Sequence, residues 1–311
     1  MKKYKALIVG FGSIGKKHLE SLVHINQFDI INLVSKHCKY NENVNEIFKN
    51  LDQVKEIESY DYFLLCSETH LHYNQLSYLN HHLNNKIIFC EKPIFHKFLK
   101  LNDIKNKIFI GYQLRFHPVI KKIKELNILD KIISSSIICG QYLPNWRKTD
   151  YRFSYSSDKK RGGGVLLDLS HEIDYILWIF GKLKKFKGIR CKVSNLKINS
   201  DDLSLINFIN QNNQVINLSI DYISKFKQRK IIAHTNNSSY EADLLANKIY
   251  CHDIEGIRTK VAIDKSKSNN LITEMHKSIL NNTKNSIACS YEEALDVLEI
   301  ISKIQKQNLY E

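Results

Sequence analysis

The feature that most constrains this chain is a glycine-rich turn, Gly10-Phe11-Gly12-Ser13-Ile14-Gly15, directly after the apolar run Ala6-Leu7-Ile8-Val9. A segment with helical character follows. In such a turn the first glycine permits a tight bend, the second lets backbone amides approach a pyrophosphate, and the third lets helix and strand pack closely. The helix N-terminus adds partial positive charge. The turn therefore predicts a dinucleotide-binding fold, with cofactor contacts from Gly10, Gly12, Ser13 and Ile14.

Strand-like and helix-like segments alternate over the first third of the chain. Strands are expected at residues 4–10, 30–34, 61–67, 86–90 and 107–111, and helices at 13–25, 69–82 and 94–102. This alternation predicts a parallel, doubly wound sheet, whose ligands bind at the carboxyl ends of the strands. Three further polar segments fall at such ends: Ser35-Lys36, Ser67-Glu68-Thr69 and Glu91-Lys92-Pro93.

After Pro118 the pattern changes. A helix at 118–128, an apolar strand at 132–139 and a polar loop at 141–160 lead to Gly162-Gly163-Gly164, which opens a helix to Phe180. Several short strands are expected within 185–262, and helices at 269–281 and 291–307. We predict an α/β protein with a Rossmann domain, 1–118, and a substrate-binding and oligomerisation domain, 119–311, built on a large, mostly antiparallel open sheet. The default ligand site is the cleft between such domains.

The composition excludes several classes of protein. The net charge is +14, but lysine supplies 39 of the 46 cations and is spread along the chain, so no nucleic-acid partner is expected. No apolar run reaches the ~18–20 residues of a membrane span, and no signal-peptide cleavage site is recognised. The seven cysteines form no CxxC pair, so neither a metal site nor disulfides are expected. We expect a cytoplasmic protein without a membrane partner.

Four motifs accompany the glycine turn: Cys90-Glu91-Lys92-Pro93, Gly111-Tyr112-Gln113-Leu114-Arg115-Phe116-His117-Pro118, the segment from Gly162 to Asp174, and Ser67-Glu68-Thr69-His70-Leu71-His72. In their order and spacing the chain resembles, over essentially its whole length, the Gfo/Idh/MocA oxidoreductases, the glucose-fructose oxidoreductase and inositol dehydrogenase family. The resemblance implies nicotinamide-dependent redox chemistry on a sugar-like hydroxyl.

The resemblance implies catalytic roles for Lys92, His171 and Asp168. Oxidising a secondary alcohol requires a hydride acceptor and a base for the hydroxyl proton. Asp168 and His171 are three residues apart, which predicts that they share one face of a helix. The family pattern is Asp-x-x-x-His, so Asp168 departs from it by one residue, whereas His171-x-x-Asp174 matches.

Further cofactor contacts are expected after the strands that follow the glycine turn. The resemblance implies Ser67, His72, Glu91 and Lys92. An enzyme that prefers NAD usually has an acidic residue at the end of the second strand, to bind the ribose hydroxyls. Here that position reads Ser35-Lys36, a hydroxyl and a cation that suit a 2′-phosphate. Both NAD and NADP remain candidates, and the pair favours NADP.

A polar, aromatic segment with two arginines, residues 142–152, precedes the triple glycine. Arginine binds carboxylates and phosphates in a bidentate manner. The segment resembles family members of bacterial surface-polysaccharide and nonulosonic-acid pathways, so we expect an anionic sugar, either a nucleotide sugar or a sialic-acid-like sugar. The expected substrate-binding residues are Tyr112, Arg115, Trp146, Arg147, Arg152, Asp168 and His171.

The sequence thus predicts an NAD(P)-dependent oxidoreductase acting on a hydroxyl or keto group of a sugar. Two alternatives stay open: a nicotinamide-assisted epimerase or lyase with no net redox change, and a non-catalytic nucleotide-binding protein. The apolar alternation within 185–262 leaves one face of the sheet open, which predicts a homodimer or homotetramer through that sheet.

Overall fold

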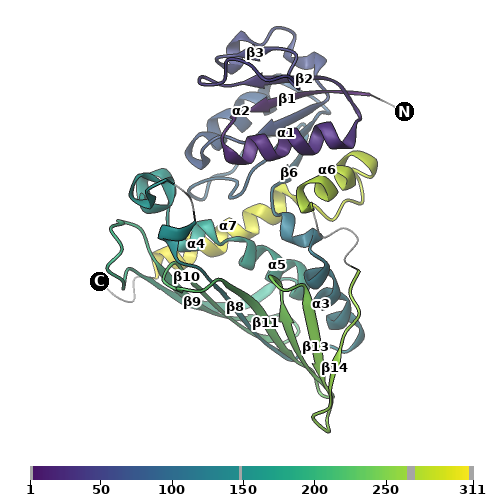
Figure 1. Ribbon diagram of the computed structural model, residues 1–311, viewed down its shortest axis with the longest axis vertical. Helices are drawn as coiled ribbons and strands as arrows, with labels where there is room; N and C mark the ends of the chain where they lie inside the picture. The colour runs from purple at the N-terminus through teal and green to yellow at the C-terminus, as the bar shows by residue number, and fades with distance from the viewer. Residues whose placement is uncertain (1–2, 147–148, 265–269, 308–311) are drawn as a thin grey trace. The chain divides into compact units, whose positions relative to one another are not determined.

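The chain divides into two compact units in a computed structural model that describes residues 3–146, 149–264 and 270–307 (Figure 1). The first unit comprises Met1–Gln113 and Asn270–Leu298, and the second comprises Leu114–Asn269 and Glu299–Glu311. Each unit has its own sheet.

The first unit has the predicted parallel sheet. Its strands lie in the order β15-β6-β5-β4-β1-β2-β3, and every pair except β15-β6 is parallel. The bounds are β1 Tyr4–Val9, β2 Phe28–Val34, β3 Ile47–Phe48, β4 Tyr62–Leu65, β5 Ile87–Cys90, β6 Lys107–Ile110 and β15 Cys289–Ser290. Residues Ala6–Val9 of β1 and the whole of β4 are apolar and buried, because helices cover such sheets on both faces.

Helix α1, Ser13–Ile25, and helix α2, His72–His82, follow β1 and β4. The buried residues of α1 recur at helical spacing and form one stripe: Gly15, His18, Leu19, Ser21 and Leu22. Helix α1 ends at Asn26, which adopts a left-handed conformation (φ 54°) and donates its amide to the carbonyls of Leu22 and Val23. A histidine in the buried stripe needs a polar partner, which becomes important below.

A segment distant in sequence completes the first unit. Helix α6, Leu271–Asn281, packs against α1, and β15 pairs antiparallel with β6. Helix α7, Tyr291–Lys306, follows, and the division between the units falls within it. We expected a division after residue 118 and a single second domain from 119 to 311. The structure instead divides the chain after Gln113 and groups residues 270–298 with the first unit.

The expected helix at 94–102 is wrong. The segment has an irregular course, because its backbone groups have partners outside it. The Pro93 and Ile94 carbonyl oxygens, which would accept from amides four residues further on in a helix, lie 3.1 and 3.2 Å from His72 Nδ1. The Leu101 amide donates to the Tyr291 hydroxyl at 2.6 Å.

The second unit is built on an eight-stranded sheet in the order β14-β13-β12-β11-β7-β10-β9-β8, in which only the β7-β10 pair is parallel. Its strands are β7 Ser134–Gly140, β8 Leu183–Cys191, β9 Leu203–Asn210, β10 Val215–Asp221, β11 Gln228–His234, β12 Ser239–Asp243, β13 Lys248–His252 and β14 Arg258–Lys260. Buried and exposed residues alternate along β9 and β10, so one face is covered and the other is open. The predicted fold class is confirmed.

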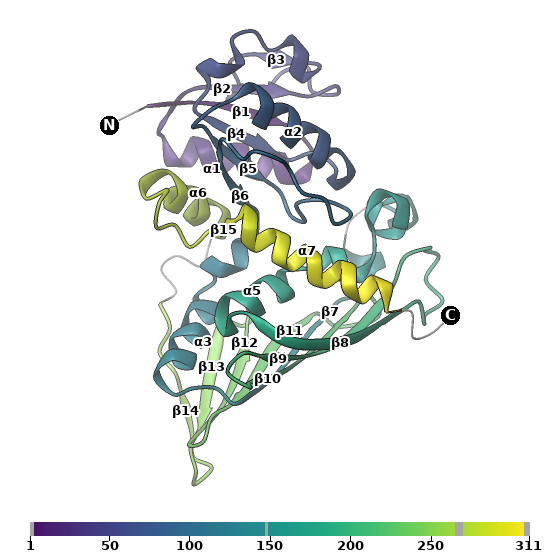
Figure 2. The same ribbon diagram turned by 180° about the vertical axis from the view of Figure 1, so that it is seen from behind.

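The helices of the second unit are α3, Pro118–Leu129, α4, Val165–Asp168, and α5, His171–Phe180. Figure 2 shows α3 and α5 together on one side of the sheet. The sequence predicted one helix from the triple glycine to Phe180. The structure has two helices, separated by Leu169 and Ser170.

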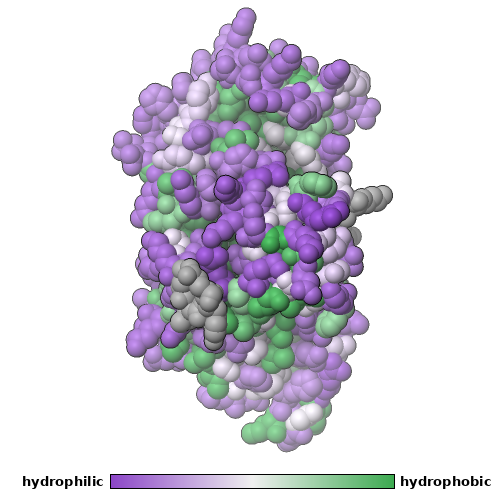
Figure 3. Space-filling model, turned by 90° about the vertical axis from the view of Figure 1, so that its left-hand side faces the viewer, coloured by the Kyte–Doolittle hydropathy of each residue, from purple (hydrophilic) through white to green (hydrophobic). Residues whose placement is uncertain are grey.

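Hydrophilic side chains cover most of the face shown in Figure 3, with hydrophobic residues in separate patches. Within the described residues, none of the helices has both the length and the apolar character needed to cross a membrane.

Candidate active site

The glycine turn is close-packed at two positions and open at one. Gly10 has φ +96°, and a Cβ there would lie 2.7 Å from the Ser67 amide nitrogen. A Cβ on Gly15 would lie 2.3 Å from the Gly10 carbonyl oxygen. A Cβ on Gly12, in contrast, would meet no described atom within 4 Å. The backbone at Gly12 is therefore accessible to a ligand.

The N-terminus of α1 lies at this open position. Gly12 is its N-cap residue and offers no side-chain cap, and the first turn carries no acidic residue. Ser13 and Ile14 are the first helical residues, and neither is buried. Amides at a helix N-terminus with no competing carboxylate suit a pyrophosphate. The residues present fit a bound dinucleotide.

Ser35 and Lys36 follow the carboxyl end of β2, as predicted. The Ser35 amide donates to the carbonyl oxygen of Phe48, and its hydroxyl accepts a hydrogen bond from the Cys38 amide at 3.2 Å. The Lys36 side chain is exposed. The preference for NADP stays a prediction.

The buried ring of His72 joins two loops. Its Nε2 lies 3.1 Å from the carbonyl oxygen of Ser67, and its Nδ1 lies 3.1 Å from that of Pro93. Burial lowers the pKa of His72, and these carbonyl oxygens act in the opposite direction. The Ser67 hydroxyl itself bonds to Gln75 Oε1 at 2.6 Å. An effect of His72 on a cofactor would therefore act through the loops that it joins.

Glu91 and Lys92 follow β5 directly. The Glu91 carboxylate accepts a hydrogen bond from the Lys92 amide at Oε2, over 3.1 Å, and its Oε1 lies 2.9 Å from His18 Nε2. Lys92 is half-buried, and its peptide bond to Pro93 is cis. Lys92 therefore lies just past the carboxyl end of a strand, as predicted.

In the second unit, the triple glycine forms a crowded turn ahead of α4. Gly164 has φ +122°, and a Cβ on Gly163 would lie 2.2 Å from the carbonyl oxygen of Tyr155. Asp201 holds the start of α4, because its backbone carbonyl accepts from Val165 and its side chain accepts from the Leu166 amide at 3.1 Å. Burial raises the pKa of Asp201.

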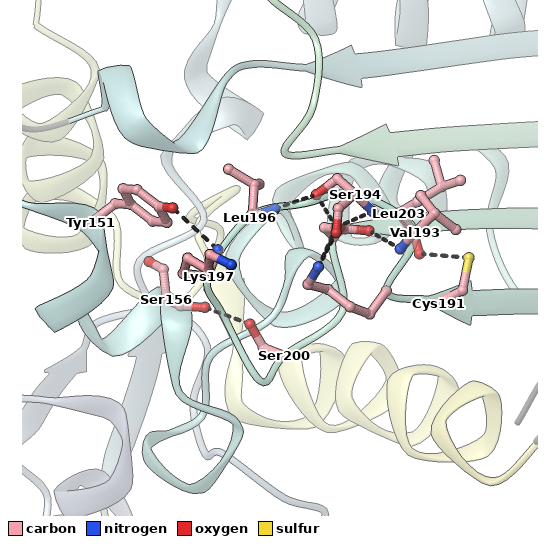
Figure 4. Close-up of polar contacts among 11 residues, drawn as sticks. Tyr151, Ser156, Cys191, Val193, Ser194, Leu196, Lys197, Ser200 and Leu203 are labelled. Carbon is pink, nitrogen blue, oxygen red and sulfur yellow. Dashed lines mark hydrogen bonds and ion pairs between the residues drawn. The ribbon is translucent and has the colours of Figure 1, made fainter.

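The connection between β8 and β9 brings Asp201 to this turn. Figure 4 shows that it is tied to the polar loop, because Ser200 donates to the Ser156 carbonyl at 2.8 Å and the Lys197 amide donates to the Tyr151 hydroxyl at 3.1 Å. Asp202 fixes the connection itself by accepting from the amides of Val193 and Ser194. The turn before α4 thus depends on residues far along the chain.

Asp168, the last residue of α4, is buried and accepts a hydrogen bond from the Tyr222 hydroxyl at 2.6 Å. Burial, followed by the Asp168 charge, raises the pKa of Tyr222 well above its usual value. The Trp146 ring meets the Tyr222 ring edge-on, with centroids 5.1 Å apart. Two predicted substrate-binding residues, Trp146 and Asp168, are therefore brought together by Tyr222.

His171 is the first residue of α5 and is 8% exposed. Leu169 and Ser170 interrupt the helix before it, so Asp168 and His171 belong to two different helices. Asp174, on the next turn of α5, is fully buried and forms a bidentate pair with Arg115, with Nη2 to Oδ1 at 2.7 Å and Nε to Oδ2 at 3.0 Å. The Arg115 guanidinium is thus directed at a carboxylate of this chain.

The other predicted substrate-binding residues have separate locations. Tyr112 is buried just after β6. Arg152 is exposed and bonds to the neighbouring Asp150 carboxylate, which lowers the pKa of Asp150. Arg147 lies outside the described residues. Their substrate roles stay predictions.

Three residues that hold predicted site residues within their own unit were not predicted from the sequence: His18 in the first unit, and Asp201 and Tyr222 in the second. His18 carried a signal, since it lies in the buried stripe of α1. Asp201 and Tyr222 carried none, because their partners come from other elements.

The parallel sheet and the open, uncapped glycine turn define a dinucleotide-binding Rossmann domain. Residues 4–108 match the model of the Gfo/Idh/MocA family, described as an oxidoreductase family with an NAD-binding Rossmann fold. Those residues carry the NAD-binding domain of that family. The match agrees with the resemblance seen in the motifs of this domain, and it supports the prediction of an oxidoreductase with a nicotinamide dinucleotide, NAD or NADP.

Solved structures match the chain over nearly its whole length. UDP-N-acetylglucosamine 3-dehydrogenase GnnA from Acidithiobacillus ferrooxidans is 14% identical, with a TM-score of 0.74 over 98% of this chain and 97% of that one. The WlbA dehydrogenase from Bordetella pertussis, in complex with NADH and UDP-GlcNAcA, is 12% identical, with a TM-score of 0.76 over 98% and 96%. Levoglucosan dehydrogenase is 14% identical, with a TM-score of 0.82 over 98% and 96%.

At these sequence identities, the structural similarity establishes the fold alone. No curated protein matches the chain.

Proposed function

We propose that this protein oxidises a hydroxyl group of a sugar, or reduces the corresponding keto group, with NAD or NADP as cofactor. The observation that carries the proposal is the glycine turn, where Gly12 is open and the N-terminus of α1 is uncapped, in a chain that also has Glu91-Lys92 at a strand end. Structurally similar proteins are named as dehydrogenases of UDP-N-acetylglucosamine and levoglucosan, which supports a sugar substrate.

Gly10, Gly12, Ser13 and Ile14 would hold the pyrophosphate, and Ser35 and Lys36 the adenosine ribose and its 2′-phosphate. When bound, the nicotinamide ring supplies the hydride acceptor or donor. The cation at Lys36 and the lack of a carboxylate at the end of β2 support a preference for NADP.

Lys92 is proposed as the group that takes the hydroxyl proton when the sugar is oxidised and returns it when the keto group is reduced. His171 is a second candidate for proton transfer. Asp168 and Trp146 are proposed to contact the sugar. Tyr222 fixes Asp168 by a hydrogen bond and Trp146 by a contact between the two rings. A nucleotide sugar or a sialic-acid-like sugar of surface-polysaccharide synthesis, in the cytoplasm, is the proposed substrate class.

The test is a spectrophotometric screen of both reduced and both oxidised cofactors against nucleotide sugars, nonulosonates and neutral free sugars. We expect turnover with a sugar and faster turnover with the NADP pair. Lys92→Ala and His171→Ala should each lower kcat at least about 100-fold, the range of lost acid–base catalysis, while dinucleotide Kd stays unchanged. Full activity in Lys92→Ala would remove Lys92 from the reaction.

The same screen separates the alternatives. A product formed without net change in reduced cofactor would indicate an epimerase or lyase. Binding of dinucleotide with no product from any sugar would favour a non-catalytic protein.

We also propose that two or four copies associate through the open face of the second unit's sheet. Apolar side chains on that face are partly exposed: Leu205 at 40%, Val215 at 47% and Ile232 at 38%. Light scattering of Leu205→Glu/Val215→Glu should show a monomer where the parent protein shows a dimer or tetramer.

A further inference from the structure

We propose that a buried hydrogen-bond chain, running from Tyr62 through His276 and His18 to Glu91, is a positioning device for Lys92. All four members lie in the first unit. Tyr62 comes from β4, His276 from α6, His18 from α1, and Glu91 follows β5. The proposal rests on the proposed role of Lys92 and adds the residues that fix its loop.

The hydrogen-bond chain is continuous. The Tyr62 hydroxyl lies 2.6 Å from His276 Nδ1, His276 Nε2 lies 2.7 Å from His18 Nδ1, and His18 Nε2 lies 2.9 Å from Glu91 Oε1. Both histidine rings are fully buried. Each packs on Phe89, with ring centroids 4.9 Å away for His18 and 5.0 Å for His276. These distances describe hydrogen bonds at normal length, in surroundings from which water is excluded.

The direction of the hydrogen-bond chain follows from its last member. The Glu91 carboxylate can only accept, so His18 Nε2 donates to it. A neutral ring that donates at Nε2 accepts at Nδ1, and this is the form that the proposal assigns to His18. His276 Nε2 then donates to His18. Burial lowers the pKa of His276 well below its usual value, so its ring is neutral and accepts at Nδ1. Burial raises the pKa of Tyr62, so its hydroxyl keeps the proton that it donates to His276.

This donation fixes one oxygen of Glu91, and the Lys92 amide fixes the other at 3.1 Å. The carboxylate also leaves no room at Gly111, where a Cβ would lie 2.6 Å from Glu91 Oε1. Glu91 is thus held from three sides and in turn orients the peptide that carries the Lys92 side chain. A misplacement of about 1 Å in a reacting group costs roughly 100-fold in rate.

The hydrogen-bond chain positions Glu91. It does not conduct protons from solvent, because Tyr62 at its far end is fully buried. It also joins α1, whose N-terminus would hold the pyrophosphate, to the loop of Lys92. The device therefore sets two parts of the proposed site relative to one another within a single unit.

The first test is the tautomer of each ring, read by long-range ¹⁵N–¹H NMR of histidine-labelled protein without cofactor. We expect an unprotonated Nδ1 and a protonated Nε2 in both His18 and His276, with the signals assigned by their loss in His18→Gln and His276→Gln. An Nδ1-protonated ring or an imidazolium at neutral pH would overturn the proposal. This readout is independent of catalysis, so it separates failure of the device from failure of the proposed function.

The second test compares variants of His18. His18→Leu should lower kcat at least about tenfold, by misplacing Lys92, with dinucleotide Kd changed less than about twofold, since a change below 0.4 kcal/mol is within ordinary scatter. His18→Gln, whose amide nitrogen can reach Glu91 in place of Nε2, should recover most of the loss. The matched control is His24→Leu on the exposed side of α1, which should leave both constants unchanged.

Equal kcat in His18→Leu and the parent protein would overturn the positioning role, as would a loss in His18→Leu confined to cofactor Kd. If His18→Leu does not fold, the comparison uses Tyr62→Phe, which removes only one hydroxyl. The expected result there is a lower kcat with unchanged cofactor Kd, together with a changed tautomer or an added exchange process at His276. An unchanged kcat and spectrum would overturn the proposal.

Discussion

In the first unit, Glu91 is held by the His18 imidazole and a backbone amide, whereas in the second unit Asp174 is held by a buried guanidinium. The two arrangements fix a carboxylate by different means. With His18 in the form proposed above, the first uses hydrogen bonds from neutral donors, and the second uses a full opposite charge. Removing one partner of a buried ion pair leaves an uncompensated charge, which is more costly than the loss of a neutral hydrogen bond. The second unit should therefore be the more sensitive of the two to substitutions around its carboxylates.

The largest effect should come from Arg115→Met. It leaves Asp174 buried without its cation, and we expect a loss of about 3–5 kcal/mol in the free energy of unfolding. The double variant Arg115→Met/Asp174→Leu should be much closer to the parent, because it removes both charges. Urea denaturation measures the free energy of unfolding of both variants. Equal losses in the single and double variants would show that packing, and not charge, holds this pair.

The second-largest expected effect is a dependence of the free energy of unfolding on pH. Burial, and then the charge of Arg229, lowers the pKa of His117 from 6.5 to about 4, while its Nδ1 accepts the Val119 amide as the cap of α3. The unfolded chain takes up this proton at higher pH than the folded chain does. Stability linked to His117 is therefore complete above pH 6.5 and falls as the pH decreases toward 4.

His117→Asn keeps a capping oxygen and removes the titration. Between pH 7 and 4 the parent should lose about 3 kcal/mol more stability than this variant. Denaturation at a series of pH values measures the difference. Parallel curves for the two proteins would contradict the assignment.

A smaller loss of stability is expected when the hydroxyl group of either of two buried tyrosines is removed. Tyr222 donates to the Asp168 carboxylate, and Tyr62 donates to a neutral histidine. Tyr222→Phe should cost about 1.5–3 kcal/mol and Tyr62→Phe about 1 kcal/mol, because bonds to charged groups are stronger. Thermal unfolding of the two variants under identical conditions gives the order, and the reverse order would contradict the comparison.

The smallest effect on stability is expected at Gly12. A methyl group there meets no described atom, so Gly12→Ala should unfold within about 0.5 kcal/mol of the parent. It would intrude where the pyrophosphate approaches, so dinucleotide Kd should rise about tenfold, or 1.4 kcal/mol. Calorimetric titration of the variant and the parent protein measures this. Unchanged affinity would place the phosphates elsewhere.

Much of the first unit was predictable because its signals are local. The glycine turn, the strand ends at Ser35, Ser67 and Glu91, and the buried strands were all read from short segments. The helix expected at 94–102 failed because the Pro93 and Ile94 carbonyl oxygens pair with the His72 ring, which comes from another element. The helix expected across Asp168 and His171 failed for a similar reason, since Asp201 and Tyr222 hold α4 in place from outside.

The sequence by itself determined the parallel sheet, the phosphate-binding turn and the positions of Lys92 and His171 along the chain, because strand, turn and helix signals act over a few neighbouring residues. The contacts that hold those residues depend on the packing of distant elements. His18 and His276 are 258 positions apart, and Asp168 and Tyr222 are 54 apart. Partners so distant are chosen by the packing of whole elements, which buries polar groups and forces each to find a hydrogen bond.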